Sequence, residues 1–264
     1  MKTTYRVLGM MSGTSLDGLD IAYCFFELKD EKWYFELQLA ETISYSEDWQ
    51  EKLNRAMELN ALQLGLLDQE YGTWLGKQAA AFIQKHGVDP QMVASHGHTV
   101  FHQPDRGLTL QIGSGQHLAL EAKLPVICDF RSLDVALGGQ GAPLVPVGDR
   151  LLFGDYGFCL NLGGISNISF EKNGERRAYD IGAANMLLNF LASQLGKTYD
   201  KDGREAATGN FNEALFQQLN QPEYFRQAFP KSLGREWFDE QCAPILNECK
   251  IPVADQLHTA CHHI

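Results

Sequence analysis

The chain has 264 residues, enough for one or two domains with a large buried core. Hydrophobic residues account for 44% and charged residues for 21%, which is ordinary for a globular protein. The formal net charge is −11, from 22 Lys and Arg against 33 Asp and Glu, and this acidic balance argues against a surface that coats nucleic acid.

No apolar run approaches the length of a membrane span, and Met1 and Lys2 lead almost directly into a predicted strand without the apolar segment of a signal peptide. The six cysteines are scattered, and none forms a C-x-x-C pair. Several lie in apolar, strand-like runs, where free cysteine behaves as a small core residue. We therefore expect a cytoplasmic protein with neither a membrane nor a nucleic-acid partner.

The first forty residues predict a β-meander. Two runs between Tyr5 and Cys24 suit β-strands, and alternating apolar and polar residues at 33–39 predict a third. The turn between the first two runs offers backbone N–H groups and hydroxyls with little side-chain bulk, which suits a polyphosphate. Turn formation alone would explain its Gly and Asp residues. Phosphate binding is favoured by the joint presence of Gly13, Thr14, Ser15, Asp17 and Gly18.

A helical region follows this meander. Asn60 is placed to cap the helix, with Gln63 three positions later, and apolar residues from Leu67 to Ile83 recur at helical spacing. Gly87 predicts the end of the helix. Beyond it we expect strands at 92–95, 108–112 and 124–128, the first and third of them buried, and a helix around 117–122.

Residues 138–148 are rich in Gly and Pro and are interpreted as a crossover between two lobes. Strand signals return afterwards, and a helix is expected from about 185 to 195, closing at Gly196. The predicted strands and turns of this half are 158–162, Gly163-Gly164, 165–170, Asn173-Gly174 and 177–181. Both halves therefore begin with strands around a polar Gly turn and then add helices, a weak repeat of architecture.

Six blocks of this sequence resemble, in the same order, the conserved blocks of the anhydro-N-acetylmuramic acid kinase family. The blocks are GMMSGTSLDGLD (9–20), SHGHTVFHQP (95–104), DFR with GGQGAPLVP (129–131 and 138–146), NLGGISNI (161–168), DIGAANM (180–186) and PKSLGRE (230–236). His98 stands in the second block where Gln is usual. Six ordered blocks over nearly the whole chain are far more specific than a single Gly-rich turn.

The resemblance implies an α/β fold of the two-lobed actin-like ATPase (RNase H-like) kind, in which each lobe is a mixed β-sheet with helices. The first lobe is expected at residues 1–135 and the second at 136–264. Family members continue well beyond Ile264, so the second lobe is expected to be incomplete. A homodimer is implied for the full-length protein.

The resemblance also implies an activity in peptidoglycan sugar recycling. Family members open the 1,6-anhydro ring of anhydro-N-acetylmuramic acid with water and place the γ-phosphate of ATP on O6, giving N-acetylmuramic acid 6-phosphate and ADP. This chemistry needs a base for the water, a clamp for the sugar and charge neutralisation on the phosphates. ATP and Mg²⁺ are the expected cofactors.

Asp180 is the expected catalytic base, because it matches the residue that activates water in the family. It also falls near the C-terminal end of a predicted strand and just before a helix, where ligand sites of α/β proteins gather. A carboxylate that only caps the following helix is the alternative. Ile181-Gly182-Ala183-Ala184 follows Asp180 where the family usually has Thr-Gly-Pro-Gly, a difference that concerns the shape of the loop.

The nucleotide is expected to bind at the first and fourth blocks. The matching residues are Gly13, Thr14, Ser15, Leu16, Asp17, Gly18, Leu19, Asp20, Gly163 and Gly164. In the ATPase superfamily acidic residues often begin the two phosphate hairpins, but Met11 and Asn161 stand at those positions here. We therefore expect no protein metal ligands and a Mg²⁺ ion held through phosphate and water.

The sugar is expected to be held by His96 and Arg131, which the family pattern assigns to the substrate cleft. A guanidinium can bind the lactyl carboxylate of the muramic sugar with two parallel hydrogen bonds. The alternatives are a surface arginine after a strand and a packed, hydrogen-bonded histidine. A metal cluster of His96, His98 and His102 is a further alternative that lacks an accompanying carboxylate or cysteine set.

The sequence is compatible with two other functions. One is a kinase for a different anhydrosugar, such as levoglucosan, which lacks the lactyl carboxylate. The other is a truncated, non-catalytic sugar- or nucleotide-binding remnant. Because the second lobe is expected to be incomplete, we expect the 264-residue chain alone to bind ATP poorly and to phosphorylate little sugar.

Overall fold

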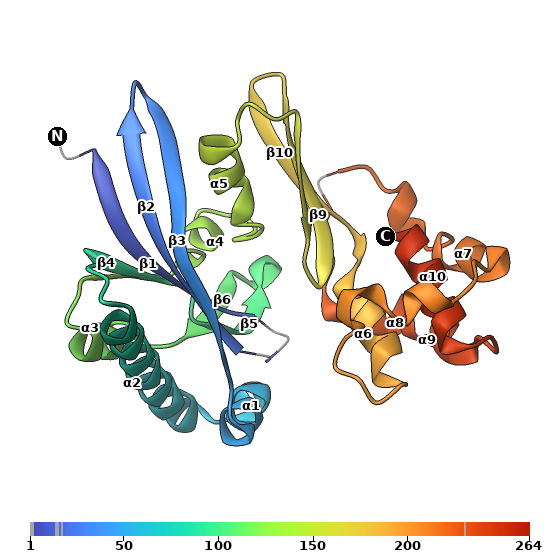
Figure 1. Cartoon of the computed structure of the whole chain (residues 1–264), viewed down its shortest axis with the longest axis horizontal. Helices are drawn as coiled ribbons and strands as arrows, with labels where there is room; N and C mark the ends of the chain where they lie inside the picture. The colour runs from blue at the N-terminus through green and yellow to red at the C-terminus, as the bar shows by residue number, and fades with distance from the viewer. Residues whose placement is uncertain (1–2, 14–15, 17, 230) are drawn as a thin grey trace. The chain divides into compact units, whose positions relative to one another are not determined.

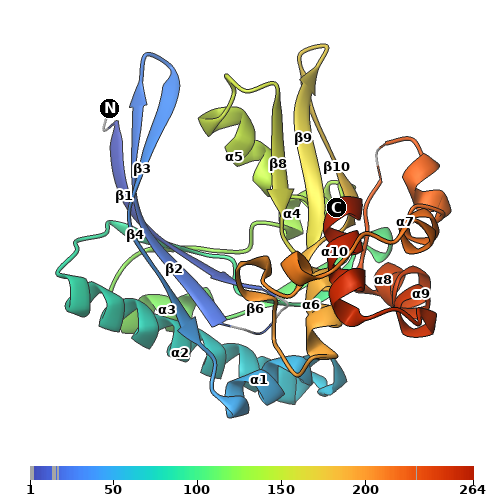
Figure 2. The same cartoon turned by 45° about the vertical axis from the view of Figure 1, so that its right-hand side comes forward.

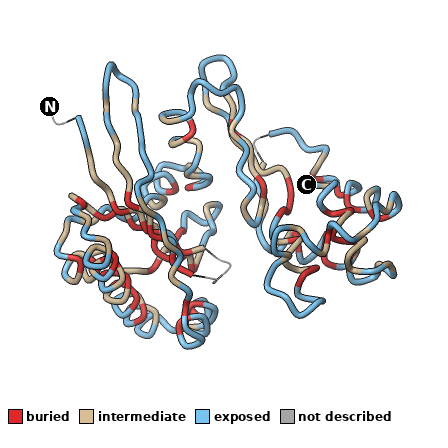
Figure 3. Tube along the Cα trace, viewed as in Figure 1, coloured by how far each residue is buried: buried red, intermediate tan, exposed pale blue. Residues whose placement is uncertain are grey.

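The computed structural model describes residues 3–13, 16, 18–229 and 231–264 (Figure 1). The chain divides into two compact units, Met1–Leu152 and Phe153–Ile264. Each unit has its own sheet and its own buried core (Figure 3). The core of the first unit combines residues of the sheet and of the helices, whereas the core of the second unit is formed mostly by helices.

The first unit contains a five-stranded mixed sheet with the order β3-β2-β1-β4-β7. Its strands are β1 (Thr4–Ser12), β2 (Gly18–Lys29), β3 (Lys32–Ser44), β4 (Met92–Ser95) and β7 (Val126–Ile127). The first three form the predicted antiparallel meander, whereas β4 pairs with β1 and β7 pairs with β4 in parallel. The predicted α/β class with a mixed sheet is thereby confirmed for this unit.

One face of this sheet packs on helices α2 (Ala61–His86) and α3 (Gly115–Ala122), which lie side by side in Figure 2. The predicted capping box is present, because Asn60 accepts from the Gln63 N–H while the Gln63 side chain accepts from the Asn60 N–H. Gly87 ends α2 in the left-handed conformation, as predicted. The core contains Leu8, Ile21, Tyr71, Phe82, Val93 and Leu118.

The first unit is completed by a hairpin and shorter helices. These are β5 (His98–Gln103), β6 (Leu108–Ile112), α1 (Glu47–Asn54), α4 (Ser132–Ala136) and α5 (Val145–Leu152), with 3-10 turns η1 (Ala56–Glu58) and η2 (Pro104–Arg106). Two predictions are wrong in detail. The strand expected at 124–128 is only two residues long and Ile127 is 50% exposed, because β7 lies at the edge of the sheet. The expected crossover at 138–148 becomes helix α5 from Val145.

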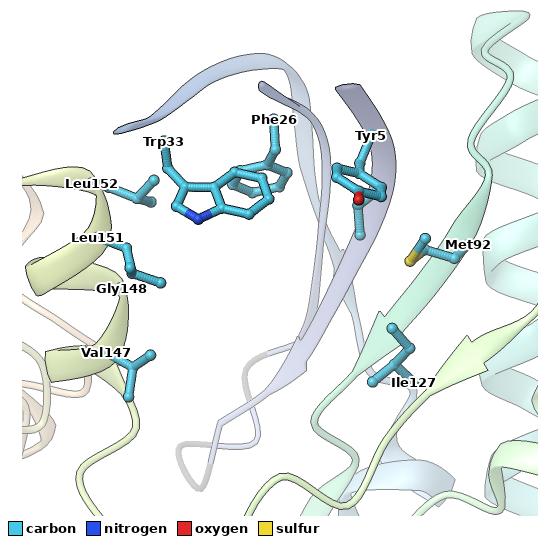
Figure 4. Close-up of a pocket in the computed structure, with 10 residues that line it drawn as sticks. Tyr5, Phe26, Trp33, Met92, Ile127, Val147, Gly148, Leu151 and Leu152 are labelled. Carbon is cyan, nitrogen blue, oxygen red and sulfur yellow. The ribbon is translucent and has the colours of Figure 1, made fainter. Parts of the chain in front are cut away.

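The opposite face of the sheet forms an apolar groove with helix α5 (Figure 4). Side chains alternate across a strand, so Leu8 enters the core while its neighbour Val7 faces this groove. The groove has a volume of about 560 Å³ and is lined by Tyr5, Val7, Phe26, Trp33, Met92, Ile127, Val147, Gly148, Leu151 and Leu152.

The second unit contains a three-stranded sheet with the order β10-β9-β8. Its elements are β8 (Phe158–Leu162), β9 (Ile165–Lys172), β10 (Glu175–Ala183), α6 (Asn185–Ser193), α7 (Glu213–Leu219), α8 (Arg235–Gln241), α9 (Ala243–Glu248), α10 (Val253–His263), η3 (Lys201–Gly203), η4 (Ala206–Thr208) and η5 (Glu223–Arg226). Both strand pairs are antiparallel, so the described strands of this unit do not form the mixed sheet that was expected of each lobe. The predicted order of strands, Gly turn and helix is present.

Two general properties follow from the described residues. No helix among them combines the length and the apolar character needed to cross a membrane. All six cysteines are free thiols.

Candidate active site

The predicted phosphate turn joins β1 to β2 in the first unit. Gly18 begins β2 in close contact with β3, since a Cβ there would lie 2.7 Å from the Ile43 carbonyl oxygen. Leu16 packs its side chain against the core, and its carbonyl oxygen accepts from Gln50 Nε2 at 3.3 Å. The predicted site residues Thr14, Ser15 and Asp17 lie outside the described residues, while Leu19 and Asp20 lie in β2.

The structure brings His96 and Arg131 together. His96 follows β4 directly, and its Nε2 accepts a hydrogen bond from Arg131 Nε at 3.0 Å. Since Nε2 is an acceptor, the ring proton is on Nδ1, which donates to the Gly97 carbonyl oxygen at 3.0 Å. Burial, and then the Arg131 charge, lower the pKa of His96, so the neutral ring is favoured.

Arg131 is half-buried and is held from a second side. Its Nη1 donates to the Gly141 carbonyl oxygen at 2.6 Å, while the Gly141 N–H donates to Asp134 Oδ2, also at 2.6 Å. Gly141 has a φ of +65°, a conformation that favours glycine. Two of the five guanidinium N–H groups are used by His96 and Gly141, which leaves three for a ligand. Arg131 is therefore not the simple surface arginine of the alternative interpretation.

The second predicted turn lies between β8 and β9. Its carbonyl groups face helix α6: the Asn185 N–H donates to the Gly163 oxygen at 3.1 Å, and the Met186 N–H donates to the Gly164 oxygen at 3.0 Å. The Asn185 amide also donates to the Leu162 and Gly163 oxygens. A Cβ on Gly163 or Gly164 would meet no atom closer than 3.4 Å, so it would make only ordinary van der Waals contacts there.

Asp180 lies in β10, where the register to β9 shifts between Asp180 and Gly182. Such bulges are common next to active sites, because they redirect side chains. The carboxylate Oδ2 accepts from the Leu233 N–H at 2.8 Å. Helix α6 has Ala184 at its N-cap without a side-chain cap, so Asp180 does not have the capping role of the alternative interpretation. Burial raises the pKa of Asp180, and the Leu233 N–H offsets part of that rise.

A segment far along the chain supports Asp180. The Asp180 N–H donates to the Lys231 carbonyl oxygen at 3.2 Å, and the Tyr224 hydroxyl donates to the Asp180 carbonyl oxygen at 2.7 Å. Lys231 Nζ in turn donates to the Tyr224 carbonyl oxygen at 2.9 Å. The sequence singled out the PKSLGRE block through its resemblance but assigned it no role, and Pro230 lies outside the described residues.

A metal centre built from the protein alone is not found in the described part of the chain. No group of three or more His, Cys, Asp or Glu residues there could hold a metal ion. His102 instead contacts Thr109 Oγ1 through Nδ1 at 3.2 Å. His98 Nδ1 lies 3.0 Å from Ser12 Oγ, so the three histidines of the second block have separate partners.

A profile of the family described as anhydro-N-acetylmuramic acid kinase matches residues 5–249. This match includes every candidate site residue from Gly13 to Asp180. The chain belongs to the anhydro-N-acetylmuramic acid kinase family. The family resemblance stated from the six blocks is thereby confirmed.

Similar proteins named anhydro-N-acetylmuramic acid kinase come from several bacteria. The one from Shewanella sediminis is 37% identical over 283 residues, covering 100% of this chain and 76% of the relative. The one from Synechococcus elongatus is 36% identical over 279 residues, covering 96% of this chain and 73% of the relative. Among solved structures, the ethanolamine utilization protein EutJ from Carboxydothermus hydrogenoformans covers 78% of this chain and 62% of its own, with 10% identity and a TM-score of 0.36, too low to support a conclusion.

Proposed function

We propose that this protein is a kinase that hydrolytically opens 1,6-anhydro-N-acetylmuramic acid and phosphorylates O6, with ATP as donor. The family match over residues 5–249 carries the proposal. The relatives from Shewanella sediminis and Synechococcus elongatus are named for this activity, and this chain aligns with about three quarters of the length of each. The proposed reaction belongs to peptidoglycan sugar recycling and takes place in the bacterial cytoplasm.

Asp180 is the proposed base. Its carboxylate takes a proton from water, the water oxygen attacks C1 of the sugar, and the C1–O6 bond breaks. O6 then attacks the γ-phosphorus, and ADP leaves. Burial supports this role, because a raised pKa makes the carboxylate a stronger base, while the bond from the Leu233 N–H to Oδ2 leaves Oδ1 for the water.

His96 and Arg131 are the proposed sugar-binding residues. The three remaining N–H groups of Arg131 suit the lactyl carboxylate, which accepts two parallel bonds from a guanidinium. His96 and Gly141 fix the orientation of that guanidinium, so less conformational entropy is lost on binding.

The turns at Gly13–Gly18 and Gly163–Gly164 are the proposed nucleotide-binding elements. The carbonyls of the second turn are engaged by α6, so its backbone N–H groups are the donors that suit a phosphate. Mg²⁺ is proposed to be held by phosphate oxygens and water. When bound with ATP, Mg²⁺ neutralises charge between the β- and γ-phosphates.

We also propose that the chain contains the two lobes expected of an actin-like ATPase, the first at 1–135 and the second from 136. Two compact units with separate cores support a division into two lobes, although the units meet between Leu152 and Phe153 and not at residue 135. A homodimer is part of the same proposal.

The proposal is tested by incubating the purified protein with ATP, Mg²⁺ and either 1,6-anhydro-N-acetylmuramic acid or levoglucosan, and following ADP release together with the ³¹P spectrum of the sugar. We expect a sugar 6-phosphate with the muramic substrate and a much lower kcat/KM with levoglucosan. Equal kcat/KM for both sugars would favour a general anhydrosugar kinase. Sugar binding by calorimetry without ADP release would indicate a non-catalytic binding protein.

A further inference from the structure

Four buried polar side chains form a continuous chain of hydrogen bonds beside the phosphate turn. Tyr71 and Tyr45 hydroxyls lie 2.6 Å apart, the Tyr45 hydroxyl donates to Ser12 Oγ at 2.8 Å, and Ser12 Oγ lies 3.0 Å from His98 Nδ1. All four residues are at most 6% exposed. They come from α2, the segment after β3, the end of β1 and the start of β5.

The contacts fix the direction of the first two hydrogen bonds in this chain, and the third depends on the tautomer of His98. Because Tyr45 donates its proton to Ser12, it can only accept in the contact with Tyr71, so Tyr71 is the donor there. If Ser12 donates onward, His98 Nδ1 is the acceptor and the imidazole proton lies on Nε2. In this order the Tyr45 and Ser12 hydroxyls each donate one hydrogen bond and accept another, and the Tyr71 hydroxyl donates to Tyr45. The chain therefore runs from Tyr71 through Tyr45 and Ser12 to His98.

The position of His98 connects two parts of the proposed site. Ser12 is the last residue of β1 and immediately precedes Gly13, where the phosphate turn begins. His98 is two residues after His96, and the intervening Gly97 carbonyl accepts the His96 Nδ1 proton. A Cβ on Gly97 would lie 2.4 Å from the Ile112 carbonyl oxygen, so the backbone between the two histidines is closely packed.

We infer that His98 is a positioning residue, which holds the Ser12 hydroxyl and thereby the entry of the phosphate turn through the chain Tyr71, Tyr45, Ser12 and His98. This inference rests on the proposed role of the turn in ATP binding. A neutral imidazole suits the task, because it accepts from Ser12 without placing a charge in the core. The alternative is a histidine that only fills space in the core, and variants with and without a hydrogen-bond acceptor at position 98 separate the two.

The test compares His98→Leu with His98→Gln in the purified protein. Leu fills the site without an acceptor, whereas the Gln amide oxygen can accept from Ser12. We expect the Leu variant to raise KM for ATP by about fivefold with little change in kcat or in KM for the sugar, and the Gln variant to stay near the wild type. Hydrogen exchange of the segment 10–20 is expected to become faster in the Leu variant and not in the Gln variant.

Tyr45→Phe provides a second perturbation if His98→Leu does not fold, since it removes the donor to Ser12 and keeps the ring. It should raise KM for ATP in the same direction. An active enzyme whose KM for ATP and exchange at 10–20 are unchanged in folded His98→Leu would overturn the inference. A wild-type protein without kinase activity would instead contradict the proposed function. In that case hydrogen exchange of the segment 10–20 still tests the positioning role, and unchanged exchange in His98→Leu would overturn it.

Discussion

Protonation of His98 should reduce the stability of the first unit below neutral pH. Burial, and then the nearby His96, lower the pKa of His98 from 6.5 to about 4. His98 is 5% exposed, so solvent does little to screen this effect. A histidine with a lowered folded pKa contributes stability that is fully present above pH 6.5, the unfolded value, and is lost as pH falls towards 4.

The size of the effect follows from the two pKa values. A difference of about 2.5 pKa units corresponds to roughly 3 kcal/mol when the pH falls below both values. At pH 5 about 2 kcal/mol of this has been lost. The Gln in His98→Gln does not titrate in this range, so the variant should lack this part of the pH dependence.

Urea unfolding at pH 7.5 and pH 5.0 measures the effect. Trp237→Phe confines the tryptophan signal to Trp33, Trp49 and Trp74 of the first unit, and serves as the common background. We expect the loss of unfolding free energy between the two pH values to be about 2 kcal/mol smaller in His98→Gln than in the His98 protein. A difference below about 0.5 kcal/mol would refute the assignment of a buried, neutral His98.

Three further predictions concern the site and its support. Arg131→Ala should raise KM for the muramic sugar by about tenfold or more and reduce discrimination against levoglucosan, and unchanged kinetics for both sugars would exclude the clamp. Gly18→Ala should lower the free energy of unfolding by about 1–3 kcal/mol in urea, because its Cβ would meet Ile43 and Thr42 below 3 Å; an unchanged midpoint would contradict this packing. Tyr224→Phe removes the donor to the Asp180 carbonyl oxygen and should lower kcat with little change in KM; a pure KM effect would argue against this support.

Local signals in the sequence were sufficient for several elements. Asn60 with Gln63 and Gly87 marked both ends of α2, and Asn173-Gly174 marked the β9–β10 turn, because capping and turn chemistry involve only neighbouring residues. Helix α5 was missed because Pro146 and Gly148 read as a loop. Proline is tolerated in the first helical turn, where its missing N–H has no partner to lose.

The candidate site was predictable only in part. Asp180, His96 and Arg131 were found through ordered blocks that resemble one family, and their assigned chemical roles remain proposals. The residues that hold them were not found: Leu233 is 53 residues from Asp180, and Tyr224 is 44. No local pattern indicates contacts at such separations, since they arise only when the chain folds.

The place of Asp134 illustrates the same limit at short range. It lies three residues after Arg131, in the first turn of α4, and accepts from the Gly141 N–H. The Gly-rich block at 138–146 was noticed for its resemblance. The sequence does not show that the Gly141 N–H has a carboxylate partner. That contact is seen only in the structure, where Gly139 and Gly141 approach α4 closely.

The central claim is that Asp180 activates water for ring opening coupled to phosphorylation. The most direct measurement is the rate of sugar 6-phosphate formation, followed by ³¹P NMR, in the wild type and in Asp180→Asn, with Asp239→Asn as a control at an exposed carboxylate of the same unit. We expect Asp180→Asn to lower kcat by about a thousandfold with sugar binding and the thermal midpoint retained, and Asp239→Asn to match the wild type. Wild-type turnover in a folded Asp180→Asn variant would contradict the account.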